Sequence, residues 1–275
     1  MLIHKLLVSG LLALACSACA GLRSSPGAYQ LLKEPLRAGP RRIHLIYARP
    51  VEPKHPDYLV VFATGDGGWR SVSSEVFEHL AAEGYSVAGI DSSSALRPGL
   101  RAGERMSTAQ AAARVTAALA DAKHDLGLPD ATPVIVVGFS RGATLVAFAA
   151  LHPELREKIG GAIALGLTRE VDYLRAPPPE RVPEVQVDQR GRVQIYPALK
   201  LLGATPLAVI QSSNDPYVPA AESRRLLGPD TPTLRLYEVE ARNHRFGGAH
   251  DRMIADVDDA LRWILAAHAS RPAEK

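Results

Sequence analysis

The feature that most constrains the fold is a serine between two glycines, placed where an apolar run gives way to a helical pattern. The segment Gly138–Gly142 reads Gly-Phe-Ser-Arg-Gly, follows the β-branched run 134–137 and precedes the apolar pattern 143–151. This is the setting of a G-x-S-x-G nucleophile elbow, in which a sharp strand-to-helix turn lifts the serine hydroxyl into the open beside a base. Glycine permits the close backbone approach of that turn, and the following helix N-terminus would stabilise an anion. We therefore expect Ser140 to be a nucleophile rather than part of a structural turn.

Apolar runs alternate with helical patterns along most of the chain. The expected strands are residues 43–48, 58–63, 86–90, 134–137, 162–165, 207–211 and 234–238. Amphipathic helices are expected to end at Gly84 and Gly127, with Ser107 and Gln110 as a capping box for the second, and a last helix is expected at 253–265. Continuous apolar strands indicate a parallel sheet covered on both faces, in which the earliest pair could form an antiparallel edge. The pattern predicts an α/β fold with a doubly wound, mostly parallel sheet, helices on both faces and ligands at the carboxyl ends of the strands.

The first twenty residues are expected to be an export signal. Lys5 supplies the positive start, residues 6–15 the short apolar core and Ala18–Ala20 the small-residue cleavage zone. The apolar core is too short to span a membrane. We therefore expect an exported, periplasmic protein.

Both cysteines of the chain, Cys16 and Cys19, lie inside this signal, so the mature protein should have no disulfide and no catalytic thiol. Ser17–Cys19 resembles a bacterial lipobox, in which Cys19 would be acylated and would anchor the protein to a membrane surface. Cleavage after Ala20 would instead release a soluble protein. Between these routes, the lipoprotein is the one we favour.

Composition and turn signals suggest one domain after a tether. The 275 residues are 47% hydrophobic and 22% charged, which suits a single globular core. A net charge of +3 with scattered basic residues gives no sign of a nucleic-acid partner. We expect a linker at residues 21–40 and a domain at 41–270. Residues 171–202, which contain Pro177–Pro179, break the pattern and form either a lid-like insertion or a surface loop.

A serine nucleophile needs a histidine base and an orienting carboxylate, in the chain order serine, acid, histidine. Asp215 follows the expected strand 207–211, and His244 lies between the last strand and the last helix. Those are the loops in which this mechanism places them. An Asp-Pro pair is also common in turns, so Asp215 alone could be structural. His250 is an alternative base, but it lies further from the strand end, and we favour His244.

A glycine-rich loop follows the strand that ends at residue 63. Its residues 64–70 expose backbone N–H groups where a second oxyanion donor belongs, and we expect the N–H groups of Asp66 and Arg141 to bind the oxyanion. Such a loop can also cradle a phosphate, but no Gly-Lys-Ser/Thr ending follows. No group of histidines and carboxylates has the spacing of metal ligands, so we expect neither a metal nor a cofactor.

Four segments together resemble the VirJ/AcvB family of bacterial virulence proteins: Gly65–Arg70, Gly89–Ser92, the elbow Gly138–Ala143 and Asn243–Gly248. The resemblance extends from about residue 58 to the last helix, and the Gly-Asp-Gly-Gly-Trp sequence of the first segment is its most specific element. It implies a periplasmic α/β-hydrolase fold. The better-understood members are similar to esterases that remove lysine from lysyl-phosphatidylglycerol.

Carried over by position, the resemblance implies that Ser140 is the nucleophile and His244 the base, whereas Asp215 is inferred mainly from its loop. The family often has phenylalanine in place of Arg141. Because a lysyl ester carries a positive amino group, its pocket should offer carboxylates, and Asp66 and Asp91 are the candidates. Both could equally well cap their own loops. Trp69 is a further candidate for contact with the substrate.

We therefore expect a serine hydrolase that cleaves an ester, with a phospholipid or small ester as its partner. The favoured substrate is an aminoacylated phospholipid such as lysyl-phosphatidylglycerol, and a generic carboxylester or thioester is the alternative. A third hypothesis is a periplasmic binding or assembly factor that keeps the fold without turnover.

Overall fold

The computed structural model describes residues 22, 27–37, 43–96, 105–175, 186–199 and 202–269. They form an eight-stranded sheet in the order β1-β2-β4-β3-β6-β7-β11-β12. The strands are β1 Tyr29–Pro35, β2 His44–Pro50, β3 Leu59–Ala63, β4 Ser86–Ile90, β6 Val134–Phe139, β7 Ile159–Leu165, β11 Leu207–Ser212 and β12 Leu234–Val239. β2 pairs antiparallel with β1 and β4, and all other neighbours are parallel. The predicted mostly parallel sheet with an antiparallel edge is confirmed.

The central strands are apolar throughout because helices cover both faces of the sheet. Every residue of β3, β4, β6, β7 and β11 is buried. In β3, Val60 and Phe62 face one apolar layer, and Val61 and Ala63 face the other. This alternation of buried residues to opposite faces explains why each strand is visible in the sequence as a short, continuous apolar run.

The segment predicted as a linker, residues 21–40, contains the strand β1. This strand pairs with β2 over its whole length, from Tyr29 opposite Pro50 to Pro35 opposite His44. Only Tyr29 is fully buried in it, and the remaining residues are half-buried or exposed. An edge strand with one solvated face has no continuous apolar run, whereas such runs mark the central strands. Residues 21, 23–26 and 38–42 lie outside the described part of the chain.

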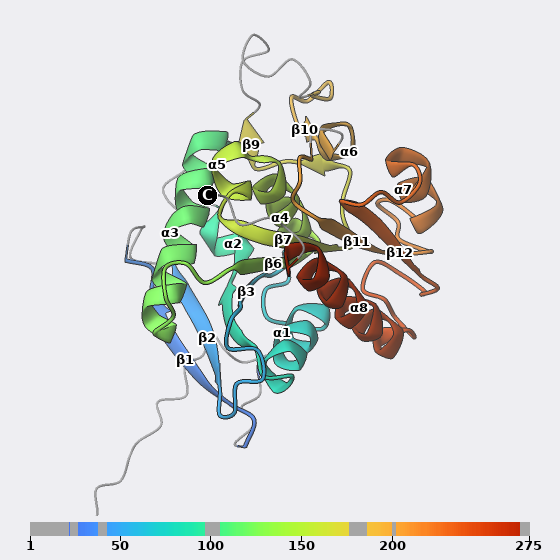
Figure 1. Cartoon of the computed structure of the whole chain (residues 1–275). Helices are drawn as coiled ribbons and strands as arrows, with labels where there is room; N and C mark the ends of the chain where they lie inside the picture. Colours follow the sequence, from blue (N-terminus) through green and yellow to red (C-terminus); the bar gives the residue numbers. More distant parts are fainter. Residues whose placement is uncertain are drawn as a thin grey trace, which may run out of the picture.

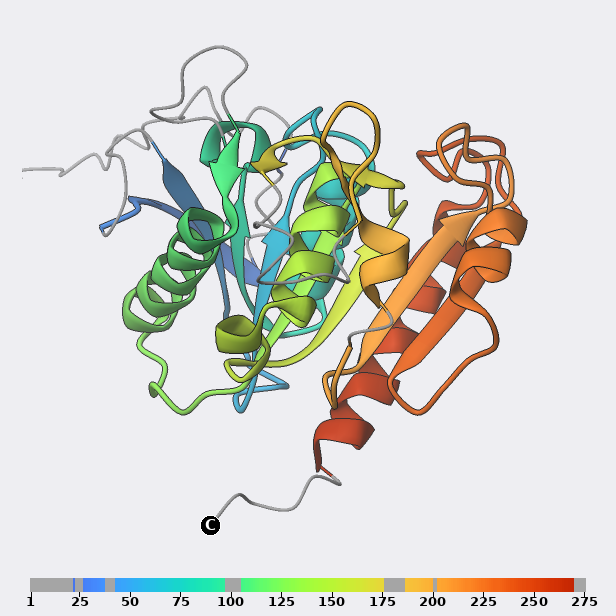
Figure 2. The same ribbon diagram turned by 90° about the horizontal axis from the view of Figure 1, so that it is seen from above.

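Helices pack on both faces of the sheet, as Figures 1 and 2 show. Their bounds are α1 Val72–Ala82, α2 Ser92–Ala95, α3 Thr108–Leu126, α4 Arg141–Leu151, α5 Pro153–Arg156, α6 Ile195–Ala198, α7 Ala220–Leu227 and α8 His250–Ala269. Phe77 of α1 and Val257 of α8 pack in one apolar layer with Phe62, whereas Leu119 of α3 and Leu145 of α4 pack in the opposite layer. The sheet is therefore covered by α1 and α8 on one face and by α3 and α4 on the other.

The start and stop signals of α3 are those that the sequence predicted. The Ser107 hydroxyl accepts from the Gln110 N–H at 3.1 Å, and the Gln110 side chain accepts from the Ser107 N–H at 2.9 Å. Gly127 ends the helix with φ 71°, a conformation in which glycine is favoured. Helix α7 was not predicted, because only Ala220 and Ser223 of its residues are buried.

Two small sheets lie outside the main one. β5 Met106–Ser107 pairs with β9 Leu174–Arg175, and β10 Val193–Gln194 pairs with β8 Glu170–Val171. The described parts of the segment 171–202 therefore contain the end of β8, β9, β10 and α6. Residues 176–185 and 200–201 lie outside the described part, and the lid-like role of the segment stays a prediction.

The predicted export signal, residues 1–20 with Cys19, also lies outside the described residues. Within the described part of the chain, no helix has the length and apolarity needed to cross a membrane.

Candidate active site

Ser140 lies in a strained turn between β6 and α4. Its backbone has φ 55° and ψ −113°, and its side chain makes no capping hydrogen bond to α4. A Cβ added at Gly138 would lie 2.3 Å from the Gly142 oxygen, and one at Gly142 would lie 2.0 Å from the Ala63 oxygen, so both positions require glycine. Non-glycine residues adopt positive φ at a cost, and such strain is typical of functional sites. The turn therefore has the geometry of a nucleophile elbow.

The structure brings Asp215 and His244 together. His244 Nδ1 lies 2.6 Å from Asp215 Oδ2. The Asp215 side chain is fully buried, and only 12% of the His244 side chain is exposed. Within the described residues, the other ring nitrogen, Nε2, is buried and has no hydrogen-bond partner. A carboxylate on Nδ1 fixes the proton there and leaves Nε2 as the nitrogen that can accept a proton.

Buried hydrogen-bond donors hold the Asp215 carboxylate in place. Gln211 Nε2 donates to Oδ2 at 2.9 Å, and the backbone N–H of Tyr217 donates to Oδ1 at 2.9 Å. The Gln211 side chain also accepts from the Leu167 N–H at 2.9 Å and donates to the Val218 carbonyl at 2.6 Å. The sequence analysis did not identify Gln211. The available signal was an amide at the end of an otherwise apolar strand, directly before the aspartate loop.

Aromatic packing places the His244 ring beside the elbow. Its centroid lies 5.0 Å from that of Phe139, the residue before Ser140, and 4.9 Å from that of Tyr217. Gly166 leaves room for the imidazole, because a Cβ there would lie 2.8 Å from His244 Cε1. The ring is thus confined between β6, the end of β7 and the loop after β11. Tyr217, with 62% of its surface exposed, is an aromatic side chain at this site that the sequence analysis did not single out.

The glycine-rich loop between β3 and α1 lies against the elbow. A Cβ at Gly65 would lie 3.2 Å from Ser140 Cβ, so the loop packs tightly against the elbow. Ser73 holds the loop from α1 by accepting from the Gly65 N–H at 3.3 Å, and Thr64 Oγ1 accepts from the Ser92 N–H at 3.2 Å. In the described part of the chain the backbone N–H groups of Asp66 and Arg141 have no hydrogen-bond partner. They are the groups that the sequence analysis proposed as oxyanion donors.

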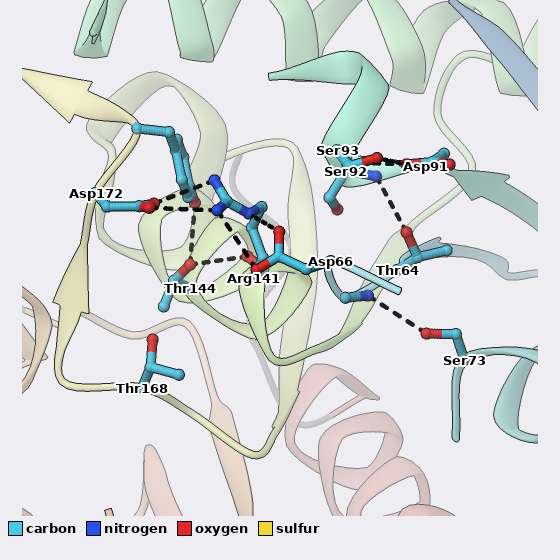
Figure 3. A network of polar contacts seen from close by, with 12 residues as sticks. Thr64, Asp66, Ser73, Asp91, Ser92, Ser93, Arg141, Thr144, Thr168 and Asp172 are labelled. Atoms are coloured by element: carbon cyan, nitrogen blue, oxygen red, sulfur yellow. Dashed lines mark hydrogen bonds and ion pairs between the residues drawn. The ribbon is translucent and has the colours of Figure 1, made fainter. Parts of the chain in front are cut away.

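Arg141 connects this loop to the other side of the site (Figure 3). Its guanidinium forms an ion pair with Asp66 and, through Nη1, one with Asp172 Oδ1 at 3.1 Å. It also lies over the Tyr173 ring, 5.5 Å from the centroid. Thr144 Oγ1 donates to the Arg141 carbonyl at 2.8 Å and lies 3.1 Å from the Tyr173 hydroxyl.

Two electrostatic effects follow from this arrangement. Burial lowers the pKa of Arg141, but the hydrogen bond to Asp66 and the charge of Asp172 outweigh it and raise that pKa above its ordinary value. Burial raises the pKa of Tyr173. Arg141 is therefore a permanent cation between two carboxylates. Asp172, in the irregular segment after β8, had no sequence signal that pointed to the site.

Other residues singled out in the sequence have local roles. Asp91 Oδ1 accepts from the N–H and the hydroxyl of Ser93 at 2.9 and 2.7 Å, which is the loop capping considered as its alternative role. Trp69 is 7% exposed and packs in the core with Phe62 and Phe77, so it offers a substrate little surface.

His250, the alternative base, opens α8, and its Nδ1 lies 2.5 Å from Glu75 Oε2 on α1. Asp215 therefore pairs with His244, while His250 is paired elsewhere. Among the described residues, no three His, Cys, Asp or Glu side chains cluster closely enough to hold a metal ion.

The strand order together with the serine elbow at the end of β6 defines the α/β-hydrolase fold. A putative dienelactone hydrolase from Klebsiella pneumoniae shares this fold at 14% identity, with a TM-score of 0.59 over 89% of this chain and 100% of that one. An esterase from Pyrococcus furiosus does so at 17% identity and a TM-score of 0.58, over 87% of this chain and 94% of its own. A puromycin-hydrolysing peptidase of Mycobacterium tuberculosis is 18% identical, with a TM-score of 0.62 over 90% of this chain and 40% of its own. At these identities the likeness shows the fold alone.

Residues 57–176 match the model of the family described as bacterial virulence protein (VirJ). The resemblance to that family is thereby confirmed over a segment that includes the glycine-rich loop, the elbow and Asp172. Asp215 and His244 lie beyond it. Among proteins of curated function, none has a sequence that matches this chain.

Proposed function

We propose that this protein is a serine ester hydrolase in which Ser140 is the nucleophile, His244 the base and Asp215 the residue that orients it. The observation that carries the proposal is the buried Asp215–His244 pair, whose Nε2 is left without a partner among the described residues beside a strained serine elbow. A buried ring nitrogen without a hydrogen-bond partner lowers the stability of the fold, and such groups are often kept for function. Here that function is acceptance of the Ser140 proton.

In the proposed mechanism, Ser140 Oγ attacks the ester carbonyl while its proton passes to His244 Nε2. Asp215 stabilises the resulting imidazolium through Nδ1. The tetrahedral oxyanion accepts hydrogen bonds from the Asp66 and Arg141 N–H groups, and the imidazolium then protonates the departing alcohol oxygen. Water, deprotonated by the same imidazole, attacks the acyl-enzyme, releases the acid and restores Ser140. No cofactor takes part in these steps.

For the substrate we propose an aminoacylated phospholipid such as lysyl-phosphatidylglycerol. The support is the match to the VirJ family together with the carboxylates beside the elbow. The side chains of Asp66 and Asp172 are 60% and 56% exposed, and one arginine lies between them. Asp66, Asp172 and Arg141 together carry one net negative charge, which suits the amino group of the aminoacyl ester. A simple carboxylester or a thioester is the alternative.

We further propose that the protein acts in the periplasm, anchored to the membrane through acylated Cys19. An anchored enzyme would meet a phospholipid substrate at the surface on which that substrate lies. Cleavage after Ala20 without acylation is the alternative route. Globomycin treatment of producing bacteria distinguishes them, because it blocks processing of an acylated precursor and leaves ordinary signal cleavage unchanged.

A fluorophosphonate probe tests the enzyme class. Wild-type protein should be labelled, and Ser140→Ala should not. Ser71→Ala is a matched control, because Ser71 also begins a helix at positive φ, 52°, and makes no side-chain capping bond. It should leave labelling unchanged. Folded wild-type protein that takes up no probe would favour the hypothesis of a binding or assembly factor.

Mass spectrometry of lipids tests the substrate. Wild-type protein should release lysine from lysyl-phosphatidylglycerol vesicles, and Asp172→Asn should raise KM for this cationic substrate more than for a neutral ester. Persistence of the lipid alongside rapid turnover of p-nitrophenyl acetate would leave a general esterase in its place.

A further inference from the structure

The proposed oxyanion donors belong to residues whose side chains also bind each other. Asp66 lies in the loop between β3 and α1, and Arg141 is the first residue of α4, directly after Ser140. Their side chains form an ion pair, in which Arg141 Nη2 also lies 3.4 Å from Asp66 Oδ2 (Figure 3). The pair thus joins the two segments that would carry the two N–H groups.

Arg141 is the fixed member of this pair. Only 12% of its side chain is exposed, and the guanidinium is held by Asp172 and the Tyr173 ring, while Thr144 donates to the main-chain carbonyl of Arg141. Tyr173 is itself 7% exposed and bound to Thr144 of α4. The guanidinium therefore has a defined position relative to the elbow.

The position of the Asp66 side chain depends on Arg141. Asp66 lies between two glycines, 60% of its side chain is exposed, and a Cβ at Gly67 would meet nothing within 4 Å. In the described part of the chain, the only hydrogen bonds to its carboxylate come from Arg141. The loop backbone is fixed on the α1 side, where Gly65 donates to Ser73 at 3.3 Å and accepts from the Gly68 N–H at 3.1 Å. Arg141 is the side chain that ties Asp66, within this turn, to the elbow.

We propose that the Arg141–Asp66 ion pair fixes the separation of the two oxyanion donors, so that both side chains act as positioning residues for the hydrolysis. This inference rests on the proposed function. Because the Asp66 carboxylate is 60% exposed, we expect its pairing with Arg141 to contribute little to folding stability and to act on the geometry of the site. Loss of one oxyanion donor costs about a hundredfold or more in kcat, and a misplacement of about 1 Å can cost about as much.

The test uses the full chain and p-nitrophenyl acetate, a neutral ester to which recognition of an amino group does not contribute. In Asp66→Asn and Arg141→Met we expect kcat to fall about tenfold to a hundredfold with KM within about twofold, because the donors act in the transition state. Affinity for a boronic acid that forms a tetrahedral serine adduct should fall in parallel. Arg141→Lys, which keeps the charge, should recover part of kcat.

Two further measurements separate positioning from a general structural effect. The double variant Asp66→Asn/Arg141→Met should be no slower than the slower single variant, because both substitutions remove one interaction. Raising the salt from about 0.05 M to about 1 M should lower kcat of the wild type more than that of Asp66→Asn, because salt screens the exposed carboxylate of Asp66. Asp259→Asn, which breaks the exposed Arg262–Asp259 pair on α8, is the matched control and should keep wild-type kcat.

Wild-type kcat in both single variants, or losses that multiply in the double variant, would overturn the positioning role while leaving the proposed hydrolase intact. A wild-type protein that neither turns over esters nor takes up fluorophosphonate would overturn both. Low kcat with unchanged KM, a salt response that is larger in proteins that carry the pair, and partial recovery in Arg141→Lys would support it.

Discussion

Replacement of Gln211 should damage both folding and catalysis, because one buried amide supports the acid loop. The Gln211 side chain is fully buried and makes three hydrogen bonds, to the Leu167 N–H, the Val218 carbonyl and Asp215 Oδ2, at 2.9, 2.6 and 2.9 Å. Gln211→Leu nearly keeps the volume but leaves the Leu167 N–H and the Val218 carbonyl without a partner, and Asp215 Oδ2 keeps, among the described residues, only His244. Each buried polar group left unpaired costs about 1–3 kcal/mol, and the leucine regains part of this by apolar burial.

We therefore expect Gln211→Leu to lower the free energy of unfolding by about 2–5 kcal/mol, a large share of the roughly 5–15 kcal/mol of a typical domain. In the folded fraction, kcat should fall about tenfold or more, because Asp215 loses a donor that orients it against His244. Urea unfolding followed by circular dichroism gives the first quantity, and p-nitrophenyl acetate turnover gives the second.

The matched control is Gln30→Leu, at an exposed glutamine of β1, which should change stability by less than about 0.5 kcal/mol. If Gln211→Leu unfolded at the same urea concentration as wild type and kept its kcat, the reasoning that assigns Gln211 the support of Asp215 would be refuted.

Three further outcomes follow from the geometry. Gly166→Ala should lower kcat about tenfold or more, because its Cβ would lie 2.8 Å from His244 Cε1. Gly127→Ala is the control: it has a similar φ of 71° with open space around it, so it should lose stability but keep kcat. The same kcat in both variants would contradict this prediction. Burial raises the pKa of Tyr85 from 10.0 to about 12, so the folded state favours the neutral phenol. This stabilisation is intact below pH 10 and is lost as the pH rises toward 12. In urea unfolding, the free energy of unfolding of Tyr85→Phe should therefore fall less between about pH 9 and pH 11 than that of the wild type. Equal falls in both proteins would contradict this prediction. Ser107→Ala should cost about 1 kcal/mol of stability by removing the capping box of α3, with no change in ester turnover, and an unchanged urea midpoint would contradict it.

The sequence predicted the central sheet because burial on both faces leaves a readable pattern. β3, β4, β6, β7 and β11 are apolar at every position but a few, and the glycines after α1 and α3 mark helix ends by their positive φ. The sequence did not predict β1, because an edge strand buries only one face. It did not predict α7 either, because this short surface helix buries only two residues. Buried strands and helices are therefore predictable from the apolar pattern of the sequence, whereas elements at the edge of the fold are not.

The same limit applies to the candidate site. Ser140, Asp215 and His244 could be named from loop positions, because this fold delivers its chemistry at the carboxyl ends of successive strands. Asp172 could not, because its contacts are with residues far away in the chain, and Gln211 is marked in the sequence only as an amide at the end of an apolar strand. Asp66 illustrates both cases: the oxyanion role proposed for its N–H follows from the glycines around it, whereas its pairing with Arg141 is visible only when the loop and the elbow are seen together.

A crystal structure of the wild-type protein after inactivation by a phosphonate ester tests directly whether Ser140, His244 and Asp215 act together. We predict phosphorus bonded to Ser140 Oγ, a phosphonyl oxygen about 3 Å from the N–H groups of both Asp66 and Arg141, and His244 Nε2 within hydrogen-bond distance of the adduct. Phosphorus on a different side chain, or an adduct on Ser140 with the His244 ring turned away and its Nδ1 parted from Asp215, would contradict this prediction.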